Sequence, residues 1–285
     1  GAIAIISPAP ALVPGLQDVI VQIKNFGTNT LTSANVSYKV GINGSVKTQG
    51  WTGSLVKGAT ANVTFTGANQ YNFTGTQTDT IIAWTSLPNG VTDEYKANDT
   101  TRSPICSALT GSYTINPAGS GSTNFLNFAS AIARLMNCGV GGPVTFTVAP
   151  GTYTEKITIG AIPNSSATNT ITFNGTDSAT TKLTDVATAA NNPAVITLSN
   201  AKYVNFKNFT IWAQGTTIGV GVLINNNSAY NRISSCLIRV SETSTSGNCF
   251  GFGVCGTSYS ATGNGTYNYF EDNTVIGGYV GASLY

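Results

Sequence analysis

The stretch VITLSNAKYVNFKNFTI, residues 195–211, decides the fold of the second half of the chain. Its last eight residues, VNFKNFTI (204–211), return more loosely as NRISSCLI (231–238) and NYFEDNTV (268–275). Apolar residues hold the third and eighth columns of these copies, and a small polar residue lies between them. A weak repeat of one β-unit at such spacing is typical of a solenoid. We therefore predict a parallel β-helix in which each copy supplies a strand, a bend and a second strand.

The columns of the repeat predict which side chains point inward. Asn208, Ser235 and Asp272 share the fifth column, where a polar turn residue is expected. The apolar columns and the alternating runs before them predict a ladder of stacked side chains. The expected inward residues are Val144, Phe146, Ile157, Ile159, Ile171, Phe173, Ile196, Leu198, Phe206, Phe209, Ile211, Val222, Ile224, Ile233, Cys236, Ile238, Phe270 and Val275.

Composition excludes several classes of function. Only 8% of the 285 residues are charged, against about 25% in ordinary globular proteins. The net charge is +2 and the basic residues are scattered, so we expect no nucleic-acid partner. No apolar run approaches the length of a membrane span. The chain has no histidine, which removes the commonest general base and metal ligand.

Residues 1–104 read as a first, separate domain. Short alternating runs at 19–24, 36–40, 46–52, 62–66 and 80–85 are separated by turn signals and contain no helical pattern. Such spacing favours a β-sandwich. Trp51 and Trp84 fall in the strand patterns, so we expect them in its core rather than stacked on sugars.

The phrases VQIKNFGTNTLTSANVSYKV, INGSV, WTGSLVKGATANVTF and NGVTDEYKANDTT, in this order, resemble the bacterial cell-adhesion-related Ig-like domain of CARDB type. The resemblance covers nearly all of residues 1–104 and implies an Ig-like sandwich. Asp93, Glu94, Asn98 and Asp99 cluster in its last segment. They could ligate a structural Ca²⁺ ion. A solvated loop is the favoured interpretation because the ligand spacing is not fixed, so we expect no cofactor.

The second domain, 105–285, starts with a linker at 102–111 and one amphipathic helix at about 123–137. Ser122 or Thr123 supplies the expected N-cap and Gly139 the end of the helix. An exposed end of a β-helix invites edge-to-edge association. We therefore expect the helix to cap the N-terminal end of the solenoid rather than to bind a partner.

Residues 110–240 resemble secreted right-handed β-helix proteins of Bacteroidota, which share the fold of the pectate-lyase-like superfamily. The resemblance rests on SYTINPAG, FLNFASAIARL, GGPVTFTVAPGTYTEKITI and TNTITFNG. It implies a large surface protein exported by the type IX system, with CARDB-like or Ig-like modules beside the helix. The chain stops at GGYVGASLY without the type IX sorting domain, so we expect the solenoid to be C-terminally incomplete.

The five cysteines predict an oxidising compartment. Cys106 and Cys138 flank the expected helix, and Cys249 and Cys255 flank the run FGFGV, which we interpret as a tight turn. Both pairs are candidate disulfides. Cys236 lies in an inward column, and we expect it to be a buried free thiol.

Carboxylates that could catalyse a reaction are few. Glu271 and Asp272 form the only adjacent acidic pair of the solenoid, and neighbours in a strand point to opposite faces. Arg232 and Arg239 lie on a neighbouring turn, where they could meet Glu271 on the outer face. We interpret these charges as solvated side chains and assign no catalytic and no metal residue.

Three positions resemble the O-glycosylation motif of Bacteroidota, in which Asp precedes Ser or Thr and an apolar residue or Thr follows. They are Thr80, Thr100 and Ser178. The motif is short, so it alone predicts sugar attachment weakly.

Two hypotheses about function follow. The first is a structural or adhesive module of a large secreted surface protein, which contacts other modules of the same polypeptide, surface polysaccharide or neighbouring cells. The second is a carbohydrate-active β-helix enzyme, a lyase or hydrolase, with an Ig-like accessory domain. The lack of convergent carboxylates favours the first. In either case we expect recognition on loops between the repeats, such as 176–192 and 241–266.

Overall fold

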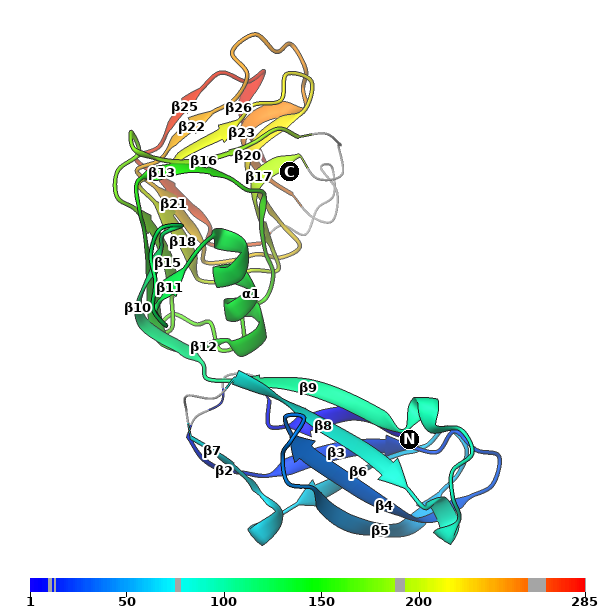
Figure 1. Ribbon diagram of the computed structural model, residues 1–285. Helices are drawn as coiled ribbons and strands as arrows, with labels where there is room; N and C mark the ends of the chain where they lie inside the picture. Colours follow the sequence, from blue (N-terminus) through cyan, green and yellow to red (C-terminus); the bar gives the residue numbers. More distant parts are fainter. Residues whose placement is uncertain (10–11, 13, 75–77, 188–192, 256–264, 285) are drawn as a thin grey trace. The chain divides into compact units, whose positions relative to one another are not determined.

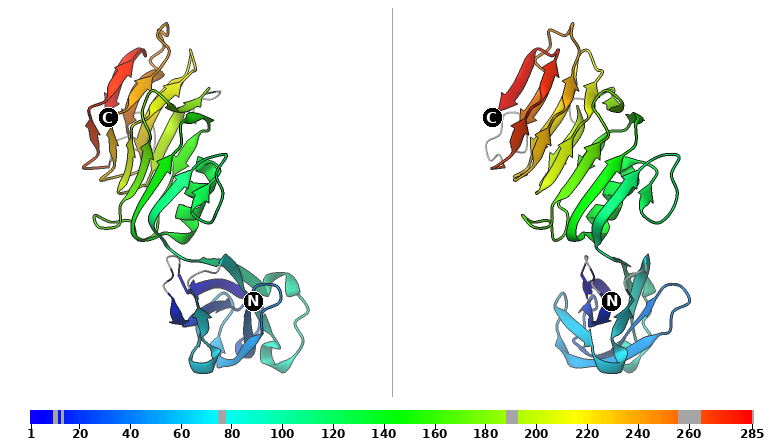
Figure 2. Two further views of the ribbon diagram at one scale, coloured as in Figure 1. Left: turned by 60° about the vertical axis from the view of Figure 1, so that its left-hand side comes forward. Right: turned by 90° about the vertical axis from the view of Figure 1, so that its left-hand side faces the viewer.

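The computed structural model describes residues 1–9, 12, 14–74, 78–187, 193–255 and 265–284. The chain divides into two compact units, Gly1–Ala108 and Leu109–Tyr285. In both, strands form most of the regular structure (Figures 1 and 2). No helix in the described residues has both the length and the hydropathy that a membrane span requires.

The first unit is an antiparallel sandwich. One sheet has the order β1-β3-β6 and the other the order β5-β4-β8-β9, and β2 pairs with β7. The strands are β1 (Ala2–Ser7), β2 (Gly15–Gln17), β3 (Val19–Lys24), β4 (Leu31–Val40), β5 (Lys47–Leu55), β6 (Thr60–Phe65), β7 (Tyr71–Phe73), β8 (Thr78–Ser86) and β9 (Thr100–Cys106). The boundary between the two units falls inside the expected linker at 102–111, but β9 and the first solenoid strand, and not turns, occupy most of that segment.

The core of the sandwich contains other aromatic residues than those expected. Tyr38 and Phe65 are buried and meet edge to face with ring centroids 4.9 Å apart. Trp51 only packs against the edge of this core, and Trp84 is half-buried. Strand alternation explains why Trp84 is only half-buried. Its side chain points to one face of β8, while those of the fully buried Ile81 and Ala83 point to the other face.

The second unit is a parallel β-helix of about five turns. Three sheets form its sides, and in each the strands of successive turns pair in parallel; the short β11 pairs with β10 at the end of the first sheet. The first sheet contains β11 (Asn124–Phe125), β10 (Leu109–Ile115), β12 (Val140–Val148), β15 (Ile171–Gly175), β18 (Val204–Lys207), β21 (Arg232–Ser234) and β24 (Tyr269–Glu271). The second contains β13 (Gly151–Thr154), β16 (Thr181–Asp185), β19 (Thr210–Ala213), β22 (Leu237–Arg239) and β25 (Thr274–Ile276). The third contains β14 (Ile157–Ile159), β17 (Ala194–Ser199), β20 (Gly219–Asn225), β23 (Cys249–Val254) and β26 (Val280–Leu284).

The repeat columns become ladders inside the solenoid. Phe146, Phe173 and Phe206 stack with centroids 4.9 and 4.7 Å apart and ring planes within 13° of parallel. All the residues predicted to point inward are buried except Phe270 and Val275, which are half-buried on the last described turn. The bend column is confirmed as well. Asn208, Ser235 and Asp272 have φ angles of 64°, 52° and 52°, which turn the chain from the first sheet into the second.

Helix α1 (Phe128–Cys138) covers the first turns of the solenoid. Phe128 is fully buried and contacts the rings of Tyr153, Phe173 and Phe209 at 5.3 to 6.1 Å between centroids. The helix begins later than expected because Asn127, and not Ser122 or Thr123, is its N-cap and accepts from the Ser130 N–H at 2.8 Å. Gly139 ends it with φ 67°, as expected.

Glu155 completes the start of α1. Its two carboxylate oxygens accept the N–H groups of Phe128 (3.2 Å) and Ala129 (3.0 Å). Those donors have no partner within the helix, and a negative charge at a helix N-terminus is favourable. Glu155 therefore anchors the helix to the solenoid wall.

We predict that Glu155→Gln destabilises the solenoid by about 1 kcal/mol, since it removes the charge and one of the two acceptors at the helix N-terminus. Denaturant unfolding, with hydrogen exchange used to assign the solenoid transition, measures the loss. The matched control is Glu242→Gln, which removes an exposed i,i+3 pair with Arg239 and is expected to cost less than about 0.5 kcal/mol. Equal losses in the two variants would contradict the role of Glu155.

Candidate functional site

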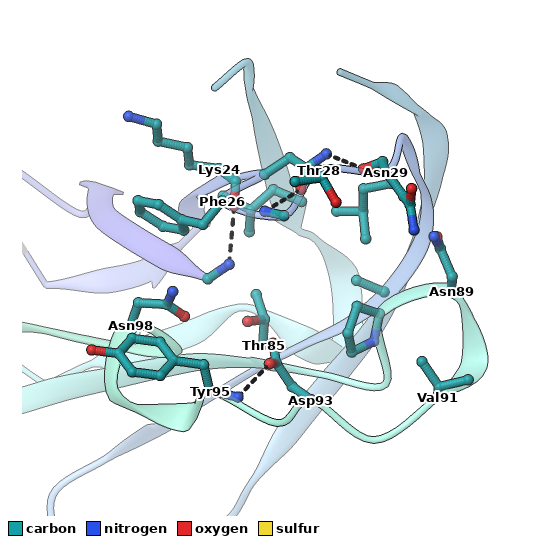
Figure 3. A pocket seen from close by; sticks show the side chains of 17 residues that line it. Lys24, Phe26, Thr28, Asn29, Thr85, Asn89, Val91, Asp93, Tyr95 and Asn98 are labelled. Atoms are coloured by element: carbon teal, nitrogen blue, oxygen red, sulfur yellow. Dashed lines mark hydrogen bonds between the residues drawn. The ribbon is translucent and has the colours of Figure 1, made fainter. Parts of the chain in front are cut away.

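A pocket opens at one end of the sandwich between the β3–β4 loop and the β8–β9 connection (Figure 3). Its volume is about 500 Å³, within the range of small-ligand sites. Figure 3 shows Lys24, Phe26 and Asn29 along one rim and Tyr95 and Asp93 along the other. The two rims are 64 to 71 residues apart in the sequence, so no short motif could have revealed the pocket.

Two asparagines fix the loops that form the pocket. The side chain of Asn25 is buried and makes three hydrogen bonds, donating to Asn29 O and Leu55 O and accepting from Gly27 N. Asn89 reaches across from the opposite loop. Its oxygen accepts from Thr32 N at 2.7 Å, and its nitrogen donates to Thr30 O at 3.0 Å. These bonds hold both rims without using the side chains that face the opening.

The acidic segment considered for Ca²⁺ is organised by hydrogen bonds within the protein. Asp93 accepts the Tyr95 N–H at 2.9 Å, and Asp99 accepts from the Thr85 hydroxyl at 3.2 Å. Glu94 is exposed, and Asn98 lines the pocket. In the described part of the chain, no three His, Cys, Asp or Glu residues are grouped so that they could hold a metal ion.

Asp99 is the buried carboxyl of this region. It is only 7% exposed. Burial raises its pKa above the ordinary value, and the neighbouring Asp93 carboxylate raises it further, while the hydrogen bond from Thr85 acts in the opposite direction. The cost of burying this charge is therefore present at neutral pH.

The carboxylates of the solenoid do not converge on one another. Glu155 caps α1, and Asp177 accepts the Ala179 N–H at 2.8 Å. Three pair with cations: Asp185 with Lys156 at 3.1 Å, Glu242 with Arg239 at 2.8 Å, and Glu271 with Arg232 at 3.1 Å. Asp272 occupies a bend. Among the described residues the solenoid thus has no pair of carboxylates placed to act as acid and base.

Arg232 meets Glu271 as predicted, whereas Arg239 pairs with Glu242 instead. Arg232 also lies 5.5 Å from the ring centroid of Tyr269. Arg232 and Tyr269 line a shallow groove of about 390 Å³ on the outer face of the first sheet, together with Asn205, Lys207 and Tyr230. The strands of the third sheet carry no Asp, Glu, Lys or Arg at all.

Beside this groove a row of tyrosines follows the solenoid axis. Tyr203, Tyr230 and Tyr267 stack with centroids 4.9 and 5.0 Å apart and planes within 9° of parallel. Each has a positive φ near 60°, which is unfavourable for an aromatic residue. Because the rings face one another, the row presents mainly edges and hydroxyls to solvent.

The cysteines differ in part from expectation. Cys106 and Cys138 are disulfide-bonded, while Cys236, Cys249 and Cys255 are free and buried. A disulfide between Cys249 and Cys255 is wrong because FGFGV is the body of strand β23 and not a turn. Six residues of extended chain separate their Cα atoms by about 20 Å, whereas a disulfide requires about 4.4–6.8 Å. Burial raises the pKa of the Cys236 thiol to about 11, so it is protonated and unreactive.

The three O-glycosylation candidates lie in different surroundings. Thr100 is exposed at the start of β9, whereas Thr80, in β8, and Ser178 are half-buried. The backbone oxygen of Ser178 also accepts the Thr210 hydroxyl at 2.6 Å. The loops expected to bind a partner fall partly on residues 188–192 and 256–264, which lie outside the described residues.

We predict that the sandwich becomes less stable as pH rises through the interval between the pKa of an unfolded Asp and the raised pKa of Asp99. In that interval the native state binds more protons than the unfolded chain, so stability must fall with rising pH. Asp99→Asn should be more stable than the wild type at neutral pH and should flatten this dependence. Unfolding midpoints at about pH 4 and pH 7 measure it. The control, Glu94→Gln at an exposed position, should keep the wild-type slope; an Asp99→Asn slope equal to that of the wild type would contradict the assignment.

Comparison with known proteins gives weak similarities only. No protein-family model matches the sequence, and no curated protein matches it. A CARDB domain from Pyrococcus furiosus, solved in complex with di-metal ions, is 23% identical, with 34% of this chain and 77% of that domain covered and a TM-score of 0.27. Pectin methylesterase PemA from Erwinia chrysanthemi is 15% identical, with 52% of this chain and 55% of that protein covered and a TM-score of 0.34.

The pectin methylesterase from Aspergillus niger is 16% identical, with 59% of this chain and 60% of that protein covered and a TM-score of 0.29. This chain therefore spans little more than half the length of these two enzymes. At TM-scores this low we draw no functional conclusion from any of the three similarities.

Proposed function

We propose that this chain is a non-catalytic, adhesive module of a large secreted cell-surface protein. The observation that carries the proposal is the use of the solenoid carboxylates. Five of the six hold a helix start, a turn or a cation, and the sixth occupies a bend. A glycosidase needs two carboxyl groups that face each other across about 5–10 Å of substrate space, and five of these six side chains are engaged elsewhere.

The disulfide supports an extracellular location. Bonds of this kind persist in oxidising compartments and are rare in the cytosol, and Cys106 and Cys138 are each disulfide-bonded. The low content of charged residues, at 8%, agrees with the Thr- and Asn-rich surfaces of extracellular β-proteins. The export route in this proposal is the type IX system of Bacteroidota, on the sequence resemblance in residues 110–240.

The second candidate function is a carbohydrate-active enzyme. It would need a carboxylate or a base on the outer face of adjacent turns, next to a groove that admits a glycan chain. The groove on the first sheet has Arg232, Lys207 and two tyrosines, but its nearest acid, Glu271, is held by Arg232 at 3.1 Å. This arrangement supports binding better than catalysis.

We also propose Thr100 as the most accessible site for an O-glycan, since it is exposed while Thr80 and Ser178 are half-buried. The intact mass of native material, compared with that of a Thr100→Ala variant, tests this. A native mass equal to the sequence mass would exclude the modification.

Incubation of the chain with neutral and acidic polysaccharides tests the proposed function. We predict no new reducing ends and no unsaturated products, together with retention of chain-coated beads on at least one polysaccharide surface. Glu271→Gln is the matched variant, because it removes the single carboxylate beside the groove. Cleavage by the wild type that Glu271→Gln abolishes would overturn the proposal in favour of an enzyme; lack of both cleavage and retention would overturn adhesion.

A further inference from the structure

We infer that the pocket at the end of the sandwich is a binding site for a neutral glycan. The inference deepens the adhesive function proposed above and rests on it. It assigns recognition to the β3–β4 loop and the β8–β9 connection rather than to the loops of the solenoid. Four features of the pocket carry it: exposed rings, unused amides, a balanced charge and rigid loops.

The first feature is a pair of aromatic rings held out of the core. Phe26 is 44% exposed and Tyr95 is 67% exposed, and they come from opposite rims of the same opening. Figure 3 shows both rings at one end of the pocket, with Asn98 between them. Single exposed apolar residues are common, but two rings that line one cavity offer a flat apolar surface. The C–H face of a sugar ring packs on such a surface.

The second feature is a set of polar side chains without partners. The amides of Asn29 and Asn98 and the hydroxyl of Thr28 line the pocket, and among the described residues their side chains make no hydrogen bond; Asn29 accepts one through its backbone oxygen only. An amide offers two donors and two acceptor positions, which matches hydroxyls that both donate and accept. Asn25 and Asn89, by contrast, are fully engaged in holding the loops.

The charge of the lining separates neutral from charged ligands. The positive groups that line the pocket are Lys24 and the Gly1 α-ammonium, and the carboxylates of Asp93, in the lining, and of the adjacent Asp99 oppose them. Lys24 is also occupied, since its ammonium lies 5.2 Å from the ring centroid of Phe26. An acidic glycan would find no surplus of cations here. The solenoid groove, which contains Lys207 and Arg232, suits an anion better.

The shape of the pocket favours a glycan over a peptide. Extended peptides bind most readily by adding a strand to an unpaired sheet edge. This pocket is made by loops at the ends of strands, and β3 and β4 are interior strands of their sheets. The loops are fixed by side-chain bonds before any ligand arrives, which lowers the entropic cost of binding.

Calorimetric titration of the full 285-residue chain tests the inference. The probes are cellohexaose, xylohexaose, mannohexaose and chitohexaose, with hexagalacturonate as the acidic probe and a tryptic digest of casein as the peptide probe. We expect saturable binding of at least one neutral hexasaccharide. Phe26→Ala and Tyr95→Ala should each weaken it about tenfold, because each removes one stacking surface.

Controls separate loss of the site from loss of the fold. Phe26→Tyr keeps a ring and should retain binding, and Tyr279→Ala, at an exposed aromatic of the solenoid, should bind like the wild type. The unfolding midpoint of each alanine variant should match that of the wild type. If Phe26→Ala fails to fold, Phe26→Leu, which keeps bulk without a ring, replaces it and is expected to lose affinity in the same way.

Several results would overturn the inference. They are no saturable binding of any neutral hexasaccharide, binding of peptide alone, or binding of a neutral probe that the Phe26→Ala and Tyr95→Ala double variant leaves unchanged. Binding of hexagalacturonate alone, lost in Lys207→Ala, would move the site to the solenoid groove. In that last case the adhesive function would stand and only the place of recognition would be wrong, whereas cleavage of a probe would overturn the proposed function itself.

Discussion

The parallel register of the Phe146–Phe173–Phe206 stack is the constraint on which the solenoid depends. Each ring lies directly above its equivalent one turn later, with centroids 4.9 and 4.7 Å apart, which is the spacing of hydrogen-bonded strands. A shift by one residue would turn every inward side chain to solvent. At its first turn the stack meets Tyr113 and Phe125, each 5.6 Å from Phe146, while Phe128 of α1 packs beside the middle ring, Phe173, at 5.9 Å. Glu155 anchors α1 in that position. Gly221 shows how little room remains, since a Cβ there would come within 2.5 Å of Ile238 Cγ2.

The bends between sheets are fixed by side-chain amides as much as by glycine. Asn231 is fully buried; its nitrogen donates to Ala201 O, and its oxygen accepts from Val204 N, both at 3.0 Å. On the next turn Asn268 accepts from Asn231 and donates to Ser228 O. Asn273 does the same at the second bend, where it bonds Cys236 N and Ile233 O. Buried backbone groups at corners need such partners, and this explains why Asn is frequent in a chain with few charged residues.

Sequence periodicity predicted the solenoid well because equivalent positions are buried in each turn. The copies 204–211, 231–238 and 268–275 pair in register, and the third and eighth columns stack as ladders from one turn to the next. Periodicity failed where tertiary context decides. FGFGV looked like a turn from its glycines, yet it is a strand whose glycines face crowded neighbours: a Cβ at Gly251 would meet Val275 Cγ1 at 2.7 Å. Trp51 and Trp84 matched strand patterns, but hydrophobic size alone does not say which face of a strand meets the core.

Sequence patterns did not predict the pocket of the sandwich as a whole, for a related reason. Its residues come from segments near 25 and near 95, which both lie in phrases that resemble CARDB domains, but none lies in a repeated column, and the sequence does not show that the two segments meet. A repeat reports what is buried in every turn, whereas a pocket depends on side chains left out of the core at one place only. The signal that could have indicated it is the unusual composition of both loops, with Phe26 beside Asn25 and Asn29, and Tyr95 beside Asp93 and Asn98. Aromatic and amide residues together in loops that also contain glycine are typical of binding loops on a rigid sandwich. In this chain the repeated side chains of the solenoid pack on one another. The loops of the sandwich do not repeat, and they retain the unpaired groups that a ligand can use.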